Sequence, residues 1–313
     1  METRAATTSA HGLEVCAPPR LPFTIKALDS IHAPSREDFE GFRAGRRPVL
    51  ITGLIDNWPA MRHWSLPYLR QRLGNREIGV YLSPDHFFPG RDQVGCDGRT
   101  SEDDGRRRHA MTASEFFDRL ETEGPERGSR CYLYAFPLTS VPDLLADVRM
   151  PESAEPSAPP RLWISAKGAI TPTHFDGNSN MLAQISGLKH VYVFPPSDFA
   201  RLYPYPSDHH YGRHSQVFDL GSAELTRYPE LAKVEALHAL VGPGTVLFIP
   251  SYWWHCVYTV ETSISVNVFD NTAAAKDLDA FADRLSEIAG RIFEALPTEL
   301  PAEMKSYLLR MMI

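Results

Sequence analysis

The sequence has few cysteines and no long hydrophobic run. Its four cysteines, Cys16, Cys96, Cys131 and Cys256, are widely spaced, and no two of them form a Cys-x-x-Cys pair. A disulfide framework or a zinc–thiolate site is therefore disfavoured, and a reducing cytoplasm fits. No stretch approaches the roughly eighteen apolar residues that a membrane helix needs, and the N-terminus lacks the apolar core of a signal peptide. We therefore expect a cytoplasmic protein without a membrane partner.

Basic residues are in the minority. The 313 residues include 32 Lys and Arg against 39 Asp and Glu, for a net charge of −7. An acidic balance of this kind disfavours a nucleic-acid partner, because phosphates bind to basic surfaces. The composition, with 43% hydrophobic and 23% charged residues, is that of a globular protein. Transmembrane, disulfide-rich secreted and basic chromatin proteins are thus excluded or disfavoured.

The first half of the chain mixes short helices and strands with polar loops. Residues 1–20 carry little apolar material and predict a disordered lead-in. The polar stretch 89–109 predicts a long surface loop, and the proline-rich stretch 151–160 predicts a second one. Ser35 and Asp38 predict the start of a helix over 36–44, which Gly45 ends. Further helices are predicted over 67–73 and 113–120, and strands over 48–53, 78–82 and 131–135.

From residue 162 onward the pattern changes to short strands separated by turns. Gly-Leu, Pro-Pro-Ser-Asp and Gly-Pro-Gly supply the turn residues. Such a series predicts an antiparallel sandwich or barrel. After Asn271, apolar residues at three- and four-residue steps predict a helix over 278–296 and a second one over 302–312. The strands are expected at 162–166, 181–185, 190–194, 245–249, 255–260 and 263–269.

The sharpest chemical feature is the segment TPTHFD, which contains His174 and Asp176. On an extended segment, residues two apart place their side chains on the same face, so both can reach one metal ion. His255, in the segment YWWH at the start of a predicted strand, offers a third ligand. Two histidines and a carboxylate that leave coordination positions open are typical of non-haem Fe(II) oxygenases. The alternative is a hydrogen-bonded surface pair of His174 and Asp176.

A lysine in the same region points to an anion. Lys189 falls within a predicted pair of strands, and no acidic residue is near it in the sequence. A buried lysine needs an anionic partner, which a dicarboxylate cosubstrate would supply. The alternative is an exposed Lys189 at the edge of a hairpin.

Three segments carry a resemblance to a known family. They read TPTHFDGNSNMLAQISGLKHVYVFPPSDFARLYPYPSDHHYGRHSQV, VGPGTVLFIPSYWWHCV and SISVNVF. The chain resembles the JmjC and cupin-like family of Fe(II)/2-oxoglutarate oxygenases, strongly over 160–270 and more weakly over 45–135. Within that family it most resembles asparaginyl hydroxylases of the factor-inhibiting-HIF type. The resemblance implies a mainly β fold, with a double-stranded β-helix or jelly-roll core over 21–270 and a helical segment over 271–313 that forms a homodimer.

The resemblance also assigns roles to residues. His174, Asp176 and His255 match the iron ligands, and Lys189 matches the lysine that pairs with the distal carboxylate of 2-oxoglutarate. Tyr132 and Thr171 match the residues whose hydroxyls hydrogen-bond this carboxylate. Asn180 and Asn267 match the amides beside the iron-bound carboxylate. These donors are chemically suited to a buried dianion.

Two positions depart from the pattern of the asparaginyl hydroxylases. Tyr134 and His214 stand where glutamines hold the target amide, whereas Arg213 keeps its match. We therefore expect Fe(II), 2-oxoglutarate and O2 to support hydroxylation of a side chain in a peptide or protein, at the β-carbon of a residue such as His, Asp or Asn. The PYPSDHHYGRHSQ segment and residues 84–110 would line the approach to the site.

Other functions remain open at this stage. The chain could hydroxylate a modified tRNA nucleoside or a small natural product. A lysine demethylase is less favoured, because a methylammonium ion calls for an aromatic cage and Tyr134 alone supports one. A non-catalytic cupin-like binding protein is the last alternative, and an intact triad together with Lys189 argues against it.

Overall fold

The computed structural model describes residues 21–83, 85–89, 107–122, 131–149, 159–206 and 209–270, together with Arg291, Glu294, Pro301 and Met304. The chain divides into two units, Met1–Asp270 and Asn271–Ile313. In the second unit Arg291, Glu294 and Met304 are helical. The lead-in predicted at 1–20, most of the loops predicted at 89–109 and 151–160, and the helical dimerisation segment otherwise lie outside the described residues.

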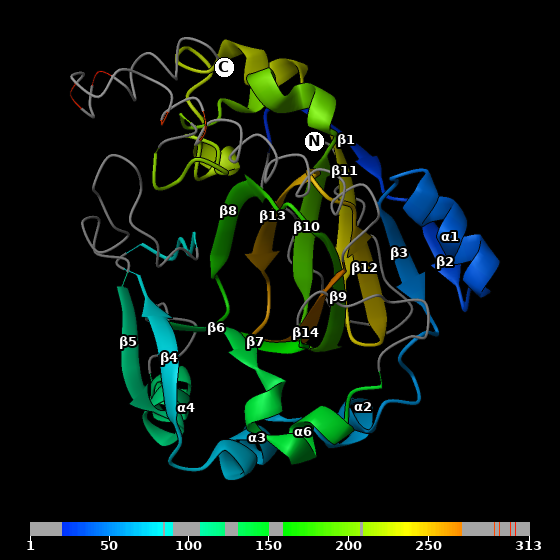
Figure 1. The fold of residues 1–313 in the computed structure, drawn as a ribbon, viewed down its shortest axis with the longest axis vertical. Coiled ribbons are helices and arrows are strands. Elements are labelled where there is room, and N and C mark those ends of the chain that lie inside the picture. Colours follow the sequence, from blue (N-terminus) through cyan, green and yellow to red (C-terminus); the bar gives the residue numbers. More distant parts are fainter. Residues whose placement is uncertain are drawn as a thin grey trace, which may run out of the picture. The chain divides into compact units, whose positions relative to one another are not determined.

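Two mixed sheets make up the first unit (Figure 1). Most neighbouring strands are antiparallel, whereas the β1/β11 and β2/β3 pairs are parallel. The five-stranded sheet has the order β1 (Thr24–Ala27), β11 (Glu235–Val241), β10 (Lys189–Phe194), β13 (Trp254–Thr259) and β8 (Ile170–Phe175). The nine-stranded sheet has the order β2 (Ser30–His32), β3 (Val49–Thr52), β12 (Thr245–Ile249), β9 (Ser179–Ser186), β14 (Ser263–Asp270), β7 (Arg161–Ser165), β6 (Cys131–Pro137), β4 (Glu77–Leu82) and β5 (Arg107–Thr112).

The strands β7 to β14 form a jelly roll. Strands β7, β9, β12 and β14 belong to the larger sheet, and β8, β10, β11 and β13 belong to the smaller one. The chain thus crosses repeatedly between two facing sheets, which is the arrangement of a cupin-like double-stranded β-helix. The predicted mainly β, jelly-roll core is confirmed.

Helices flank the strands. The predicted helix over 36–44 is confirmed, since the Ser35 hydroxyl accepts from the amide of Asp38 at 3.1 Å and the Asp38 carboxylate accepts from the amide of Ser35 at 3.1 Å. None of the helices in the described ranges has the length and hydropathy of a membrane span. The helices are α1 (Arg36–Ala44), α2 (Pro59–His63), α3 (Leu66–Leu73), α4 (Ala113–Thr122) and α6 (Pro142–Ala146), with 3-10 turns η2 (Leu138–Ser140), η3 (Pro196–Leu202), η4 (Leu220–Ser222) and η5 (Pro229–Lys233).

Strands β1, β2, β5 and β11 were not among those expected from the sequence, and the physical reason is clear for β5 and β11. β5 begins at Arg107, inside the stretch 89–109 that we expected to be a loop throughout. Its sequence RRHAMT has few β-branched residues, and it pairs as an edge strand with β4 alone; charged side chains are common on such edges, where they oppose aggregation. β11 was not expected, because EALHALV is rich in helix-forming residues. Pairing with β1 and β10 on either side overrides that preference.

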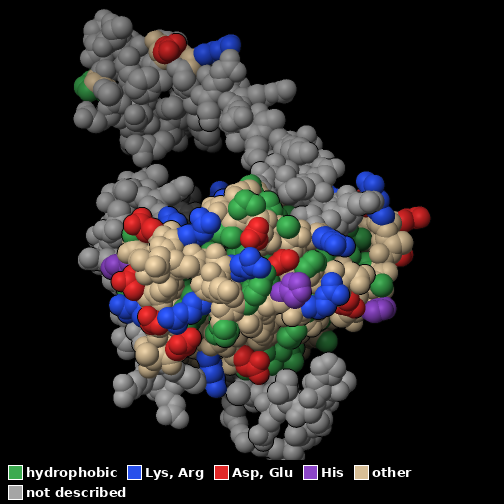
Figure 2. All heavy atoms as spheres, turned by 90° about the horizontal axis from the view of Figure 1, so that it is seen from below, with side chains coloured by type: hydrophobic (Ala, Val, Ile, Leu, Met, Phe, Trp, Pro, Cys, Tyr) green, Lys and Arg blue, Asp and Glu red, His purple; other side chains and the backbone are tan. Residues whose placement is uncertain are grey.

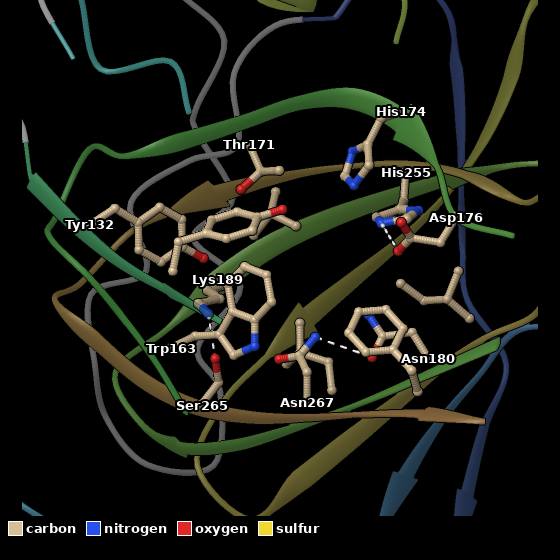
Figure 3. A pocket seen from close by; sticks show the side chains of 15 residues that line it. Tyr132, Trp163, Thr171, His174, Asp176, Asn180, Lys189, His255, Ser265 and Asn267 are labelled. Carbon is tan, nitrogen blue, oxygen red and sulfur yellow. Dashed lines mark hydrogen bonds and ion pairs between the residues drawn. The ribbon is translucent and has the colours of Figure 1, made fainter. Parts of the chain in front are cut away.

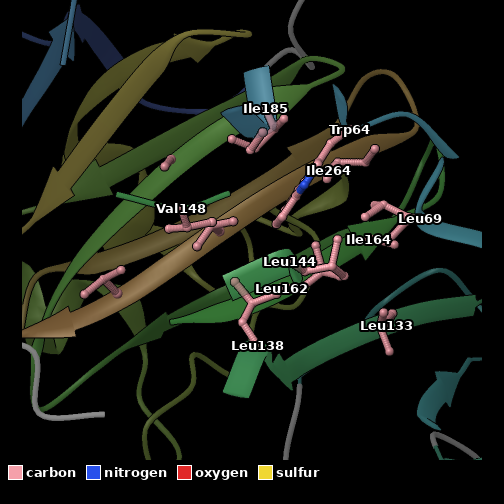
Figure 4. Close-up of a cluster of buried hydrophobic side chains, with 14 of the residues drawn as sticks. Trp64, Leu69, Leu133, Leu138, Leu144, Val148, Leu162, Ile164, Ile185 and Ile264 are labelled. Atoms are coloured by element: carbon pink, nitrogen blue, oxygen red, sulfur yellow. The ribbon is translucent and has the colours of Figure 1, made fainter. Parts of the chain in front are cut away.

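The main hydrophobic core lies on the outward face of the larger sheet. Leu162 and Ile164 of β7 and Ile264 of β14 pack with Trp64 and with side chains of α3 and α6 (Figure 4). The intervening residues of the same strands face inward, because side chains alternate along a strand. The inward positions of β7, β9 and β14 therefore line the space between the two sheets, where the candidate site lies.

Charges on the surface are mixed. Figure 2 shows the molecule from below, with Lys and Arg side chains interspersed among Asp and Glu. Arg70 pairs with Asp118 and Arg72 with Asp143 in this part of the molecule. The described part of this face thus carries no continuous basic surface.

Candidate metal centre

The three predicted metal ligands come together at the end of the smaller sheet. His174 lies in β8 directly opposite His255 in β13, and Asp176 follows the end of β8. The potential ligand atoms of the three side chains all lie within 4.8 Å of one another. The His255 Nε2 atom is 3.8 Å from the Asp176 Oδ2 atom. Figure 3 shows the three side chains pointing toward one another.

The backbone around the triad explains this convergence. The register of β8 and β13 shifts between His255 and Val257, and such bulges redirect side chains near functional sites. Tyr252, just before β13, has a left-handed φ of 66° and donates its amide to the Asp176 carbonyl at 2.8 Å. The turn before His255 is thereby tied to the residue that carries the carboxylate.

Each histidine is oriented by a carbonyl two residues before it. The Nδ1 atom of His174 is 2.9 Å from the Pro172 oxygen, and that of His255 is 3.1 Å from the Trp253 oxygen. A carbonyl only accepts, so Nδ1 carries the proton and the Nε2 lone pair is left for a metal. This is the tautomer that a metal ligand needs.

The electrostatics favour neutral imidazole. Burial, and then neighbouring His174, lower the pKa of His255 to about 4, while Asp176 opposes the change. His255 is therefore neutral at neutral pH and available as a ligand. With two imidazoles and one carboxylate, the donor set matches the facial triad of non-haem iron enzymes.

A pocket extends from the triad into the space between the sheets (Figure 3). It contains about 510 Å³ of empty space, its open mouth included. Its lining combines hydroxyl, amide, ammonium and aromatic groups. These are Tyr132, Tyr134, Trp163, Thr171, His174, Asp176, Asn180, Leu182, Lys189, Ile249, His255, Val257, Ser265, Asn267 and Phe269.

Lys189 is the charged group at the other end of this pocket. It is 2% exposed, and its Nζ atom donates to the Ser265 hydroxyl at 2.9 Å. Among the described residues no carboxylate pairs with it, and burial alone lowers its pKa to about 7. The alternative of an exposed lysine at a hairpin edge is therefore wrong. A buried ammonium group with one hydroxyl partner is suited to an anion from outside the chain.

Two predicted hydroxyls lie near this lysine. The Tyr132 hydroxyl, from β6, hydrogen-bonds with the side chains of Thr171 in β8 and Ser165 in β7. Burial raises the pKa of Tyr132, so the phenol stays protonated and can donate. The structure thus brings together Lys189, Tyr132 and Thr171, which were predicted from distant segments.

The two predicted amides form a pair nearer the triad. Asn267 in β14 donates through Nδ2 to the Asn180 oxygen in β9 at 3.1 Å, and both residues are buried. Within the described residues, the Asn267 Oδ1 atom and the Trp163 Nε1 atom are buried without a hydrogen-bond partner. Buried polar groups are normally paired. The unpaired Trp163 N–H on the pocket wall therefore suits an acceptor such as a carboxylate, whereas the unpaired Asn267 oxygen needs a donor.

Sequence reasoning missed part of the lining. Trp163, Ser265 and Phe269 were not singled out, although all three line the pocket. The alternation of side chains along a strand could have identified Trp163. It stands between Leu162 and Ile164, which face the core, so it must face the other side of the sheet.

The three predicted substrate contacts have different positions. Tyr134 lines the pocket with its ring centroid 4.0 Å from that of Trp163. Arg213 is exposed, close to Gly177 just beyond Asp176. His214 is buried, does not line the pocket and stacks on His174. The substrate roles of all three stay predictions.

Comparison with known proteins agrees with this fold. Residues 34–274 match the cupin-like domain family. Lysine-specific demethylase 8 of Danio rerio is 31% identical over 252 residues, which are 77% of this chain and 58% of that protein. The human tRNA wybutosine-synthesizing protein 5 is 27% identical over 302 residues, covering 89% of this chain and 91% of that protein. The human bifunctional peptidase and (3S)-lysyl hydroxylase is 27% identical over 285 residues, covering 82% and 86%.

These relatives differ in length and in what their names describe. The chain spans 52% to 59% of the demethylase 8 proteins of Xenopus tropicalis and Danio rerio and of the Drosophila melanogaster Jumonji C domain-containing protein 5. The finer resemblance to asparaginyl hydroxylases stays a prediction. The match over 34–274 is decisive at the level of the family. The chain belongs to the cupin-like domain family and has its relatives among the JmjC oxygenases.

Proposed function

We propose that this protein is an Fe(II)- and 2-oxoglutarate-dependent dioxygenase that hydroxylates an amino-acid side chain within a peptide or protein. The observation that carries the proposal is one pocket with a metal-binding triad at one end and an ammonium group without a carboxylate partner at the other. Fe(II) would be held by His174, Asp176 and His255. When bound, Fe(II) with 2-oxoglutarate and O2 supplies the oxidising power to hydroxylate an unactivated C–H bond.

The residues of the chain account for the binding of the cosubstrate. Lys189, with Tyr132 and Thr171 beside it, would receive the distal carboxylate through charge-assisted hydrogen bonds. Asn180 and Asn267 would donate to the carboxylate nearer the metal. Lys189 is only 2% exposed, and this burial strengthens the contact at that end of the pocket.

The substrate class rests on the mouth of the pocket and on one relative. Tyr134 in the pocket and exposed Arg213 near Asp176 would contact a side chain other than a plain asparagine amide, and Arg213 suits a carboxylate. We propose reaction at the β-carbon of a residue such as His, Asp or Asn. The name of the (3S)-lysyl hydroxylase supports this position, because C3 of lysine is its β-carbon.

A second candidate is a modified tRNA nucleoside. It is favoured by the tRNA wybutosine-synthesizing relative, which aligns over 89% of this chain. The net charge of −7 and the mixed charges seen in Figure 2 weigh against it. A lysine demethylase is named among the relatives, and Tyr134 beside Trp163 offers the aromatic faces that a methylammonium ion requires. A small natural product as substrate, a homodimer through 271–313 and a cytoplasmic location stay predictions.

A matched peptide series tests the proposal. The full chain is incubated with Fe(II), 2-oxoglutarate and O2, and with peptides that differ only at a central His, Asp, Asn, Lys or methyl-lysine. Mass spectrometry then distinguishes the gain of one oxygen from the loss of a methyl group, and succinate is measured in parallel. Hydroxylation of at least one peptide, absent with Asp176→Ala, is expected. No gain of oxygen in any peptide, or demethylation alone, would overturn the proposed substrate class.

A further inference from the structure

The outer edge of β8, the strand that carries His174, is closed by two segments from different parts of the chain. The first is residues 85–89: the Phe88 amide donates to the Ile170 carbonyl at 2.8 Å, and the Ile170 amide donates to the His86 carbonyl at 2.9 Å. The second is residues 213–215: the Ser215 amide donates to the Thr173 carbonyl at 2.8 Å. The edge next to the metal ligand is therefore fully paired on the described residues.

His214 lies where these two segments meet. Its side chain is 3% exposed, and its Nε2 atom is 2.9 Å from the Pro89 carbonyl oxygen, to which it donates. Its ring stacks on that of His174, with centroids 5.2 Å apart and planes inclined by 16°. Backbone bonds to Tyr211 at 2.7 Å and to Tyr205 at 2.9 Å hold the residue from both sides.

We propose that His214 is a positioning residue, which holds the ring plane of the metal ligand His174 by stacking and joins segment 85–89 to the metal centre through Pro89. The inference rests on the proposed function in that it takes the triad as a metal site. It replaces the direct substrate contact expected from the sequence, because the Nε2 atom of His214 is already bonded to Pro89 and the residue does not line the pocket.

The physical need for such a residue follows from the geometry of His174. Its hydrogen bond to the Pro172 carbonyl fixes Nδ1 but leaves the ring free to tilt about that bond. The parallel ring of His214 against the face of His174 removes this freedom. His255 contacts the ring of His174 as well, at a centroid distance of 4.2 Å. Losing an interaction that orients a metal ligand typically lowers metal affinity by about 10–100-fold.

Two substitutions separate the stacking from the hydrogen bond. His214→Phe keeps a flat ring but cannot donate to Pro89, whereas His214→Gln keeps a donor but has no ring. Both side chains fill most of the buried volume. Mn(II) binding to the metal-free protein is measured without substrate, from the decrease in the EPR signal of free Mn(II). Amide hydrogen exchange is measured at Phe88 and Ile170. Gln216→Ala, an exposed change directly after residues 213–215, is the matched control.

We expect His214→Gln to weaken Mn(II) binding by about tenfold or more, and His214→Phe to stay within about threefold of the unmodified protein. We expect His214→Phe to speed exchange at Phe88 and Ile170, and Gln216→Ala to change neither measurement. Mn(II) binding unchanged in both His214 variants, with a raised KM for peptide, would overturn the inference in favour of a substrate contact. Unchanged Mn(II) binding in Asp176→Ala would instead overturn the metal site and with it the proposed function.

Discussion

The two faces of the larger sheet differ completely in chemistry, although they alternate residue by residue along the same strands. On β7, Leu162 and Ile164 face outward into the hydrophobic core, whereas Trp163 faces the pocket. On β14, Ile264 is outward and Ser265, the partner of Lys189, is inward. The outward face is apolar and closely packed, whereas the inward face retains buried polar atoms that have no partner in the described part of the chain. Neighbouring positions therefore report separately on stability and on ligand binding.

The largest effect is expected on the inward side, at Lys189. Replacing it with alanine leaves a bound dicarboxylate without its buried charge partner, a loss of about 3–5 kcal/mol. The KM for 2-oxoglutarate should rise by on the order of a hundredfold or more, while Mn(II) binding to the triad stays the same. Succinate formation against 2-oxoglutarate concentration measures the first quantity, and EPR measures the second. Unchanged 2-oxoglutarate dependence would remove Lys189 from the site.

A neighbouring pair on β7 sharpens the comparison. Ile164→Ala opens a cavity in the core and should lower the free energy of unfolding by about 2–5 kcal/mol, with the KM for 2-oxoglutarate unchanged below the melting temperature. Trp163→Phe should leave the core intact but raise that KM, because the indole N–H in the pocket is lost. Urea unfolding and steady-state kinetics on both variants provide the check. The same pattern in both variants would contradict the division between the two faces.

The affinity for 2-oxoglutarate should depend on pH through Lys189. Burial lowers its pKa to about 7 in the empty site, so above that pH the lysine is neutral and must gain a proton to bind a carboxylate. The Kd for 2-oxoglutarate should therefore rise by up to about tenfold per pH unit above pH 7 and level off below it. Calorimetry from pH 6.5 to 8.5 measures the slope, with Lys189→Ala as the control that should show none. A flat profile in the unmodified protein would contradict the burial of an uncompensated ammonium group.

The smallest effect concerns the smaller sheet, where His190 and His238 form a pair with Nδ1 and Nε2 2.8 Å apart. Burial, and then His190, lower the pKa of His238 to about 4. Below about pH 6.5 the His238 imidazole binds a proton in the unfolded chain but stays neutral in the folded chain. The free energy of unfolding should therefore fall as the pH drops from 6.5 toward 4. His238→Gln should flatten this dependence in urea unfolding between pH 7 and 5. Equal slopes for the two proteins would show that the pair does not titrate as described.

The sequence predicted those features that depend on local pattern. The cap of α1 at Ser35, the strand at β7 and the His174–Asp176 spacing all follow from neighbouring residues. β11 could not be predicted in this way, because its helix-forming residues are held extended by strands on both sides. β5 is polar and pairs on one side, so it lacks the apolar alternation of a buried strand.

The position of His214 also escaped prediction. Its stacking on His174 depends on two segments that meet only in the folded chain, at Pro89 and at residues 213–215. The sequence motif matched this position to a substrate-binding glutamine, but a motif says nothing about which way a side chain points. The face of a sheet on which a strand residue lies can be predicted from the sequence, whereas the packing of loops against a strand edge cannot.

The central claim is that His174, Asp176 and His255 bind the iron that drives 2-oxoglutarate turnover. The most direct measurement compares iron content and succinate formation in the unmodified protein and in Asp176→Ala. The unmodified protein should retain one Fe(II) per chain and form succinate from 2-oxoglutarate, and the variant should lose both, because two neutral imidazoles remain without their anionic partner. Full iron content and full succinate formation in Asp176→Ala would contradict the account.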